Sequence, residues 1–212
     1  MTITRDDYAK WIKAFALVIN ENKEFLTQLD SAIGDADHGI NMDRGFQAVL
    51  NKMPSLETQD IGAMSKGIGM VLISTVGGAS GPLYGTFFLQ IGMTSAGKLE
   101  LSLTEWITAL ESAIDGIVKR GKASPGDKTM LDSLMPGLAA LKEKAVAGAS
   151  ISEALHASAD AAQAGMLATI PWIAKKGRAS YLGERSAGTQ DPGATSSYLL
   201  LKAAADTWNG LS

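Results

Sequence analysis

Apolar side chains recur at helical spacing along almost the whole chain, and this pattern limits what the sequence can fold into. Tyr8, Trp11 and Phe15 begin one such pattern, which predicts an amphipathic helix that runs to about Leu29. The same three- and four-residue spacing returns in residues 46–53, 106–117, 131–141 and 194–208. Helices therefore dominate the predicted fold.

Helix starts and one ambiguous region complete this prediction. The pairs Ser102–Glu105 and Ser150–Glu153 have the spacing of capping boxes, which begin helices. In residues 61–94 the run MVLIST is also compatible with a buried strand, but we predict two helices separated by GGASGP. The sequence thus predicts an all-α protein of about eight helices without a strand, arranged as an antiparallel up-and-down bundle or barrel.

Composition restricts the kind of protein further. With 212 residues, 46% hydrophobic side chains and a formal net charge of −3, the chain can bury the core of one domain over residues 1–212. Lys and Arg form no run, which argues against nucleic acid as a partner, and the absence of cysteine excludes disulfides and thiolate metal sites. No apolar signal core or membrane-spanning run is present, so we expect a cytoplasmic protein without a membrane partner.

The segment LDSAIGDADHGINMDRGF gathers carboxylates where glycines interrupt the helical pattern. Asp30, Asp35 and Asp37 can converge at a connection between two helices, because residues two apart share a face in a turn or extended segment. Two carboxylates about 4 Å apart repel by about 4 kcal/mol at an effective dielectric constant of 20. Three of them need a cation or a shared proton, and oxygen ligands favour Mg²⁺ or Ca²⁺ over zinc.

Calcium bound in an EF-hand is excluded by spacing. A loop that starts at Asp35 would place Ile40 at the glycine position and Phe46 at the glutamate position. Magnesium with a phosphorylated ligand is then the natural interpretation, against the alternative that these acids are solvated turn residues or helix caps. Asp43 and Asp132 lie within predicted helices and are expected to be solvated or to face a partner.

Three glycine-rich loops separate other predicted helices. GKASPGDKTMLDSL imitates a P-loop, but Asp127 precedes Lys128, so the required Gly-Lys-Ser/Thr run is absent. GGASGPLYG places free N–H groups and the Ser80 hydroxyl at a helix N-terminus, which suits phosphate oxygens. GRASYLGERSAGTQDPGATS carries Arg178 ahead of the last helix. If alternate connections of the bundle lie at one end, these loops and the acidic segment form one mouth.

Taken together, GDADHG, GGASGPLYG, GDKTMLDSL, GRASYLGERS and DPGATS resemble the nucleotide-binding L subunits of dihydroxyacetone kinases, over about residues 30–193. The resemblance implies an eight-helix barrel that binds ADP or ATP at one rim. It implies that Asp30, Asp35 and Asp37 hold two Mg²⁺ ions that bridge the nucleotide phosphates. It maps the nucleotide contacts onto His38, Gly39, Ile40, Asn41, Ala79, Ser80, Gly121, Met130, Arg178, Asp191, Pro192 and Gly193.

The resemblance also implies a reaction and partners. In the phosphotransferase-system branch of that family, a phosphohistidine protein phosphorylates the bound ADP, and the γ-phosphoryl group passes to dihydroxyacetone on a separate K subunit. A homodimer and contact with an operon regulator are further expectations. We find no general base and assign no catalytic residue in this chain. His38 could instead be a phosphocarrier, a metal ligand or a helix cap. The alternatives are a kinase of another acceptor, such as a fatty-acid kinase, and a non-catalytic Mg²⁺–nucleotide sensor.

Overall fold

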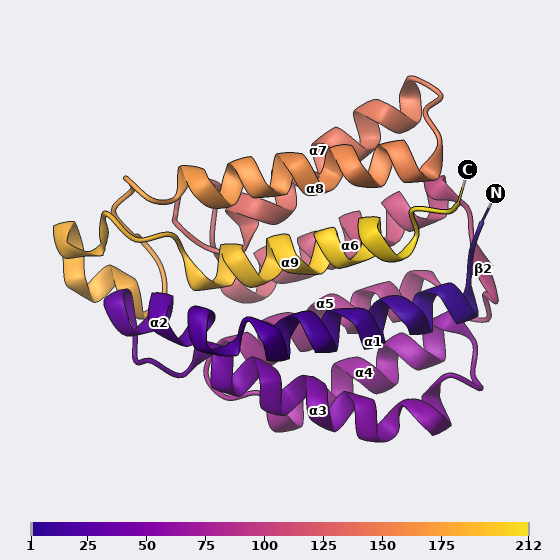
Figure 1. Cartoon of the computed structure of the whole chain (residues 1–212), viewed down its shortest axis with the longest axis horizontal. Helices are drawn as coiled ribbons and strands as arrows, with labels where there is room; N and C mark the ends of the chain where they lie inside the picture. Colours follow the sequence, from indigo (N-terminus) through magenta and orange to yellow (C-terminus); the bar gives the residue numbers. More distant parts are fainter. Residues whose placement is uncertain (1, 212) are drawn as a thin grey trace.

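The computed structural model describes residues 2–211, and these residues form a bundle of antiparallel helices (Figure 1). The elements, in chain order, are β1 (Ile3–Thr4), α1 (Arg5–Glu21), α2 (Lys23–Ile33), α3 (His38–Leu56), α4 (Ile61–Thr75), α5 (Ser80–Thr94), β2 (Glu100–Leu101), α6 (Leu103–Gly121), α7 (Leu131–Val146), α8 (Ile151–Ala168), the 3-10 segment η1 (Arg178–Ser186) and α9 (Pro192–Thr207). None of the helices between residues 2 and 211 is both long and apolar enough to cross a lipid bilayer.

The two ends of the bundle are built differently. Successive helices run up and down, so the two chain termini, β1 and β2 lie at one end, whereas α2, η1 and the start of α9 lie at the other (Figure 1). The predicted all-α, up-and-down architecture is confirmed. Both helices predicted in residues 61–94 are present, and α4 packs closely on α5 because Gly69 lies against the Gly85 carbonyl, where a Cβ atom would be 2.8 Å from the oxygen.

Two sequence predictions differ from the structure. Ile3 and Thr4 pair antiparallel with Leu101 and Glu100 to form a small sheet, although no strand was predicted. Strands of two residues are too short to show an alternating pattern, and their partners are far apart in sequence. The first helix also ends earlier than predicted: Asn22 interrupts it, and its side-chain amide donates to the Val18 carbonyl at 2.8 Å.

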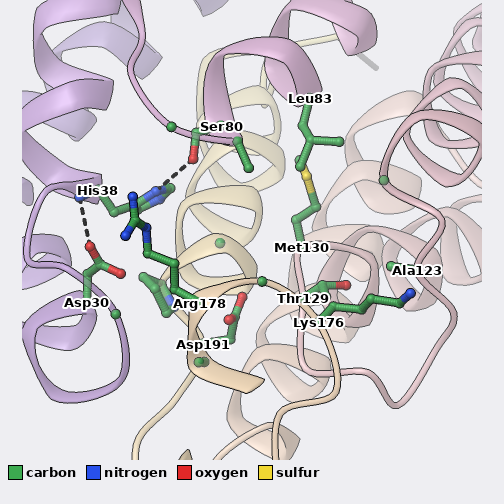
Figure 2. Close-up of a pocket in the computed structure, with 18 of the residues that line it drawn as sticks. Asp30, His38, Ser80, Leu83, Ala123, Thr129, Met130, Lys176, Arg178 and Asp191 are labelled. Carbon is green, nitrogen blue, oxygen red and sulfur yellow. Dashed lines mark hydrogen bonds between the residues drawn. The ribbon is translucent and has the colours of Figure 1, made fainter. Parts of the chain in front are cut away.

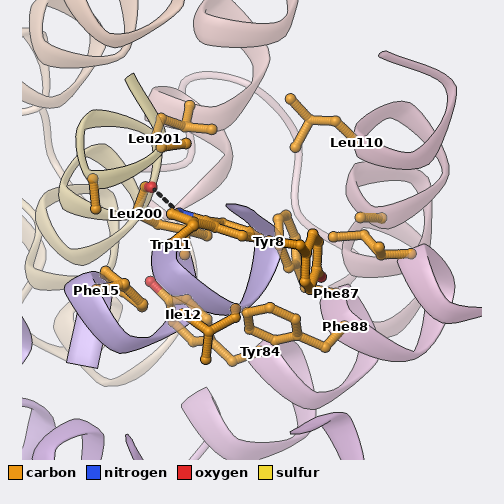
Figure 3. Packing of buried hydrophobic residues seen from close by; sticks show 14 of the residues in the cluster. Tyr8, Trp11, Ile12, Phe15, Tyr84, Phe87, Phe88, Leu110, Leu200 and Leu201 are labelled. Atoms are coloured by element: carbon orange, nitrogen blue, oxygen red, sulfur yellow. Dashed lines mark hydrogen bonds between the residues drawn. The ribbon is translucent and has the colours of Figure 1, made fainter. Parts of the chain in front are cut away.

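Aromatic rings fill the centre of the bundle (Figure 3). Trp11 and Trp106 meet edge to face with ring centroids 5.4 Å apart, and Trp208 packs against both rings. The Trp11 indole N–H donates to the Leu200 carbonyl at 3.1 Å, which joins α1 to α9. Together with Phe15, these side chains are fully or almost fully buried, so they follow the core pattern that the sequence predicts.

Candidate functional site

A cavity of about 500 Å³ opens at the end of the bundle away from the chain termini. The α2–α3, α4–α5, α6–α7 and α8–α9 connections all contribute to its wall. The prediction that alternate connections form one mouth is therefore confirmed. Because backbone from four separate loops meets here, the site depends on the bundle to bring its parts together.

The acidic residues converge as predicted. One carboxylate oxygen from each of Asp30, Asp35 and Asp37 lies within 4.8 Å of the others. The backbone of Ala36 has a φ of 61°, a left-handed conformation that turns the chain sharply between the two neighbouring acids. Asp30 is 8% exposed, and its Oδ2 atom accepts hydrogen bonds from the backbone N–H groups of Asp37 and His38, at 2.8 and 3.1 Å. The cluster is thus an oxygen-only donor set with one buried and two more accessible members.

A cation from the last long loop already approaches this cluster. The Nε atom of Arg178, in η1, lies 3.0 Å from the Asp35 carboxylate. The arginine side chain is 67% exposed, so water screens the pair and the guanidinium is accessible from the cavity. Figure 2 shows Arg178 on the same side of the pocket as Asp30 and His38.

The opposite side of the pocket presents an apolar surface, which Thr129 and Lys176 border (Figure 2). Leu83 from α5 and Met130 before α7 lie next to each other there, with Ala123 nearby (Figure 2). Met130 is 5% exposed and lines the cavity, so it combines packing with a surface against which a flat ring can lie. The pocket therefore has a charged half and an apolar half, a combination that suits a phosphorylated aromatic ligand.

His38 lies beneath the charged half and is almost completely buried. Its Nδ1 atom is 3.0 Å from the Ser80 hydroxyl, and its Nε2 atom is 2.9 Å from the Ser196 hydroxyl. Burial lowers the pKa of the ring, although the carboxylates of Asp30 and Asp37 oppose this shift. Because both ring nitrogens face hydroxyl groups, neither is free to hold a metal ion or a phosphoryl group in this arrangement.

The predicted nucleotide contacts fall into two groups. The larger group lines the cavity, and it consists of His38, Ala79, Ser80, Gly121, Met130, Arg178, Asp191, Pro192 and Gly193. Gly39, Ile40 and Asn41 lie in the first turn of α3 and do not line the cavity. Gly39 packs against α2, where a Cβ atom would lie 2.0 Å from the Lys23 carbonyl oxygen, and buried Asn41 accepts from Arg44 at 2.7 Å.

Asp191 is, like Asp30, a buried carboxylate of the pocket. Its Oδ2 atom accepts from the Ala194 N–H at 2.6 Å and so caps α9. Burial raises the pKa of Asp191 to about 7, although the hydrogen bond from Ala194 acts in the opposite direction. The charge of Asp132 adds to the increase, and Lys128 opposes it.

Two residues have a different environment in the structure from the one predicted from the sequence. Asp132 was expected to be solvated or partner-facing, but it is 5% exposed. Its carboxylate accepts from the N–H groups of Gly126 and Thr129, at 2.6 and 2.7 Å, so it orders the loop that carries Met130. Asp43 is half-buried and lies 3.6 Å from the Lys23 ammonium, so it is not a freely solvated residue either.

Two lysines of the pocket were not predicted as site residues. Lys128 lines the cavity, yet its buried ammonium donates to the carbonyls of Trp172 and Ser186, at 3.1 and 2.6 Å. It therefore ties the long α8–α9 connection to the α6–α7 loop. Lys176 also lines the pocket (Figure 2). For Lys176, the signal in the sequence was the cluster of basic residues around Arg178, of which only the arginine was predicted as a site residue.

Comparisons with known proteins identify the family of the chain. The model of the DAK2 domain family matches residues 32–206. The chain is 44% identical over 202 residues to the ADP-binding subunit of the PEP-dependent dihydroxyacetone kinase of Escherichia coli. The aligned region covers 95% of this chain and 96% of that protein. The chain is also 41% identical over 200 residues to the ADP-binding subunit of the PTS-dependent dihydroxyacetone kinase of Lactococcus lactis, with 94% and 96% covered.

A solved structure shows the same architecture. The dihydroxyacetone kinase of C. freundii in complex with AMP-PNP and Mg²⁺ superposes with a TM-score of 0.72 at 25% identity. The match covers 93% of this chain but only 33% of that one, so the chain corresponds to about a third of the larger enzyme. The resemblance inferred from the five loop motifs is confirmed, and the chain belongs to the DAK2 domain family.

Proposed function

We propose that the chain is the nucleotide-binding phosphotransferase subunit of a dihydroxyacetone kinase. ADP retained in the pocket is phosphorylated to ATP by a phosphotransferase-system phosphoprotein. The γ-phosphoryl group then passes to dihydroxyacetone held on a separate K subunit, giving dihydroxyacetone phosphate. The observation that carries this proposal is a single cavity with a carboxylate cluster on one side and the apolar wall of Leu83 and Met130 on the other. Relatives described as ADP-binding subunits match the chain over nearly their whole length.

The acidic cluster fits Mg²⁺. Asp30, Asp35 and Asp37 offer only oxygen atoms, within 4.8 Å of one another, which is the donor chemistry that this hard ion prefers. We propose that they hold two Mg²⁺ ions, which would neutralise phosphate charge when bound. The Asp35–Arg178 ion pair shows that the cluster already attracts a cation.

The chain itself would hold and orient the nucleotide. Asp30 accepts from the His38 N–H at the start of α3, which leaves the Gly39 and Ile40 N–H groups of that turn within the described residues. In α5 the first-turn N–H groups of Ser80 and Gly81 have no side-chain cap, so all four groups can face phosphate oxygens. Gly39 and Ile40 would thus contact the nucleotide through the backbone, and Asn41, whose N–H donates to the Asp37 carbonyl at 2.8 Å, would contribute through its side chain. Ser80 and Arg178 add a hydroxyl and a guanidinium from the wall of the cavity.

Gly121, Met130 and the segment Asp191–Gly193 would enclose the nucleoside part. All of them line the cavity, and Gly121 and Gly193 lie beside its apolar wall, where a Cβ atom would be 3.3 Å from the Leu83 side chain and 3.8 Å from the Met130 side chain, respectively. Positioning and charge neutralisation are the main requirements of phosphoryl transfer. We assign no catalytic base to this chain, so the partner subunit would activate the sugar hydroxyl. Residues 1–212 would form one domain, and the subunit would form a homodimer and contact an operon regulator.

The metal assignment is tested by Asp35→Asn. This change should remove most Mg²⁺-dependent ADP retention without unfolding the helices, because it deletes ligand charge at a surface loop and creates no cavity. ADP in the purified protein is measured by native mass spectrometry. Asp6→Asn is the matched control, since Asp6 also lies 3.0 Å from an arginine, Arg5, but at the other end of the bundle. An Asp35→Asn protein that retains stoichiometric ADP contradicts the metal site.

Reconstitution tests whether ADP binding and dihydroxyacetone phosphorylation are divided between two subunits. The isolated chain should bind ADP yet phosphorylate dihydroxyacetone negligibly, and adding a K-type subunit with a phosphoryl donor should restore turnover. Robust kinase activity of the chain alone would overturn the two-component scheme. Nucleotide binding without turnover in any reconstituted mixture would favour a sensor, and turnover only with a fatty-acid-carrying partner would favour the other kinase.

A further inference from the structure

A chain of buried hydroxyl groups leads from the pocket into the core through His38. Ser80 lines the cavity and contacts the Nδ1 atom of the imidazole, as Figure 2 shows. On the other side of the ring, Ser196 contacts Nε2 at 2.9 Å and lies 2.7 Å from the hydroxyl of Tyr84. Ser196 and Tyr84 are fully or almost fully buried, so the inner part of this chain is shielded from solvent.

A neutral imidazole couples its two neighbours because it has one N–H donor and one acceptor nitrogen. If Nδ1 carries the proton, it donates to the Ser80 oxygen, and the Ser80 hydrogen is free to point into the pocket. If Nε2 carries the proton, Nδ1 must accept from Ser80, and the hydroxyl is turned away from the pocket. The tautomer of His38 therefore decides whether Ser80 can donate to a ligand.

The inner neighbours select between these arrangements. The buried Tyr84 hydroxyl has to donate its proton, and the Ser196 oxygen at 2.7 Å is closer than the Ser197 oxygen at 3.3 Å. The Ser196 proton can go either to His38 Nε2 at 2.9 Å or to the Gly193 carbonyl at 3.1 Å. The shorter contact favours Nε2 as the acceptor, which places the ring proton on Nδ1.

We propose that His38 is a positioning residue whose ring, bonded to Ser196 on its inner side, holds the Ser80 hydroxyl as a donor toward a phosphate oxygen in the pocket. This inference rests on the proposed nucleotide function. The ring nitrogens act through the two serine hydroxyls and not through a contact of their own with the phosphate. The contribution of the ring is to give the Ser80 hydroxyl a fixed direction before the nucleotide binds, which reduces the cost of ordering that group.

The tautomer can be observed directly by ¹⁵N NMR of the ring nitrogens, since the chain has only two histidines and His156→Gln assigns the remaining signal. With ADP and Mg²⁺ bound, we expect Nδ1 of His38 to be protonated and Nε2 to be unprotonated. ADP binding with an Nε2–H ring, or with both nitrogens protonated, overturns this inference alone. Absence of ADP binding by the unmodified chain overturns the proposed function and this inference with it.

A double-mutant cycle tests the coupling by calorimetric titration with ADP and Mg²⁺. Ser80→Ala should weaken ADP binding by about tenfold, and Ser196→Ala by about fivefold, although Ser196 does not line the cavity. In the Ser80→Ala background, Ser196→Ala should have no further effect, because its influence passes through Ser80. Additive losses overturn the proposal. Ser197→Ala is the matched control: it removes a buried hydroxyl that also contacts Tyr84, and should leave both affinity and tautomer unchanged.

Discussion

Helices begin differently at the two ends of the bundle. At the end with the chain termini, α1, α4, α6 and α8 each start at a residue whose side chain accepts a backbone N–H of the first turn, namely Thr4, Asp60, Ser102 and Ser150. At the pocket end, α3, α5 and α7 start without such a cap in the described structure. At the first end, the cap residues satisfy the helix starts. At the pocket end, Asp30 accepts from the His38 N–H of α3 and Thr129 accepts from the Leu131 N–H of α7. The N–H groups that stay available to an anion within the described residues are therefore those of Gly39 and Ile40 in α3 and of Ser80 and Gly81 in α5, together with the positive helix dipole ends.

Asp191 is the exception at the pocket end, since it caps α9 with a buried carboxylate. Its raised pKa predicts the largest effect. Between about pH 4 and pH 7 the folded protein keeps a proton on Asp191 that the unfolded chain has released, because the two pKa values are about 7 and 3.8. Unfolding then releases a proton, so the free energy of unfolding falls as the pH rises, by up to about 4 kcal/mol for this group.

The variant Asp191→Asn should lose this pH-dependent contribution while keeping the cap, because the amide oxygen can still accept from Ala194. The measurement is urea unfolding of nucleotide-free protein at several pH values from 4.5 to 8, compared with the unmodified chain. Asp60→Asn, which changes a half-buried cap at the other end, is the control. Parallel stability curves for the Asp191→Asn and unmodified proteins would show that Asp191 is not protonated in the folded state.

The same contrast explains which features the sequence could predict. The capping boxes at Ser102 and Ser150 and the helical pattern are local signals, and the structure contains both. The convergence of the acids was also predictable, because the glycines and the turn lie within one short segment. By contrast, Lys128 binds carbonyls 44 and 58 residues away, and Asp132 orders a loop whose shape depends on packing. Contacts of this kind require the folded bundle and have no local pattern.

A second prediction compares one substitution at each end of the bundle. Ser102→Ala should lower the free energy of unfolding by about 1 kcal/mol, because it removes a helix cap. It should leave ADP binding unchanged, since α6 begins far from the pocket. Asp37→Asn should weaken ADP binding and should not lower the free energy of unfolding. Without metal it relieves repulsion within the acidic cluster and should leave stability equal or up to about 1 kcal/mol higher.

The two variants are compared by urea unfolding without ligand and by calorimetric titration with ADP and Mg²⁺. For Asp37→Asn the proposed function predicts a large loss of affinity together with unchanged or improved stability, the usual sign of a functional residue that is costly to the fold. If both variants lose stability equally and retain ADP, the pocket end is an ordinary part of the scaffold and the contrast between the ends fails.

The smallest expected effect on stability belongs to Arg178→Ala. The Arg178–Asp35 pair is separated by 3.0 Å, but the arginine is 67% exposed, so the pair should contribute at most a few tenths of a kcal/mol to folding. If the guanidinium binds phosphate, the same change should weaken ADP retention and slow the reconstituted reaction, and Arg178→Lys should restore only part of the loss because lysine cannot make a two-pronged contact. Arg5→Ala removes a similar exposed pair at the capped end and should change neither property. Equal ADP retention by the two alanine variants would mean that the Arg178 side chain serves only to neutralise Asp35 in the ligand-free protein.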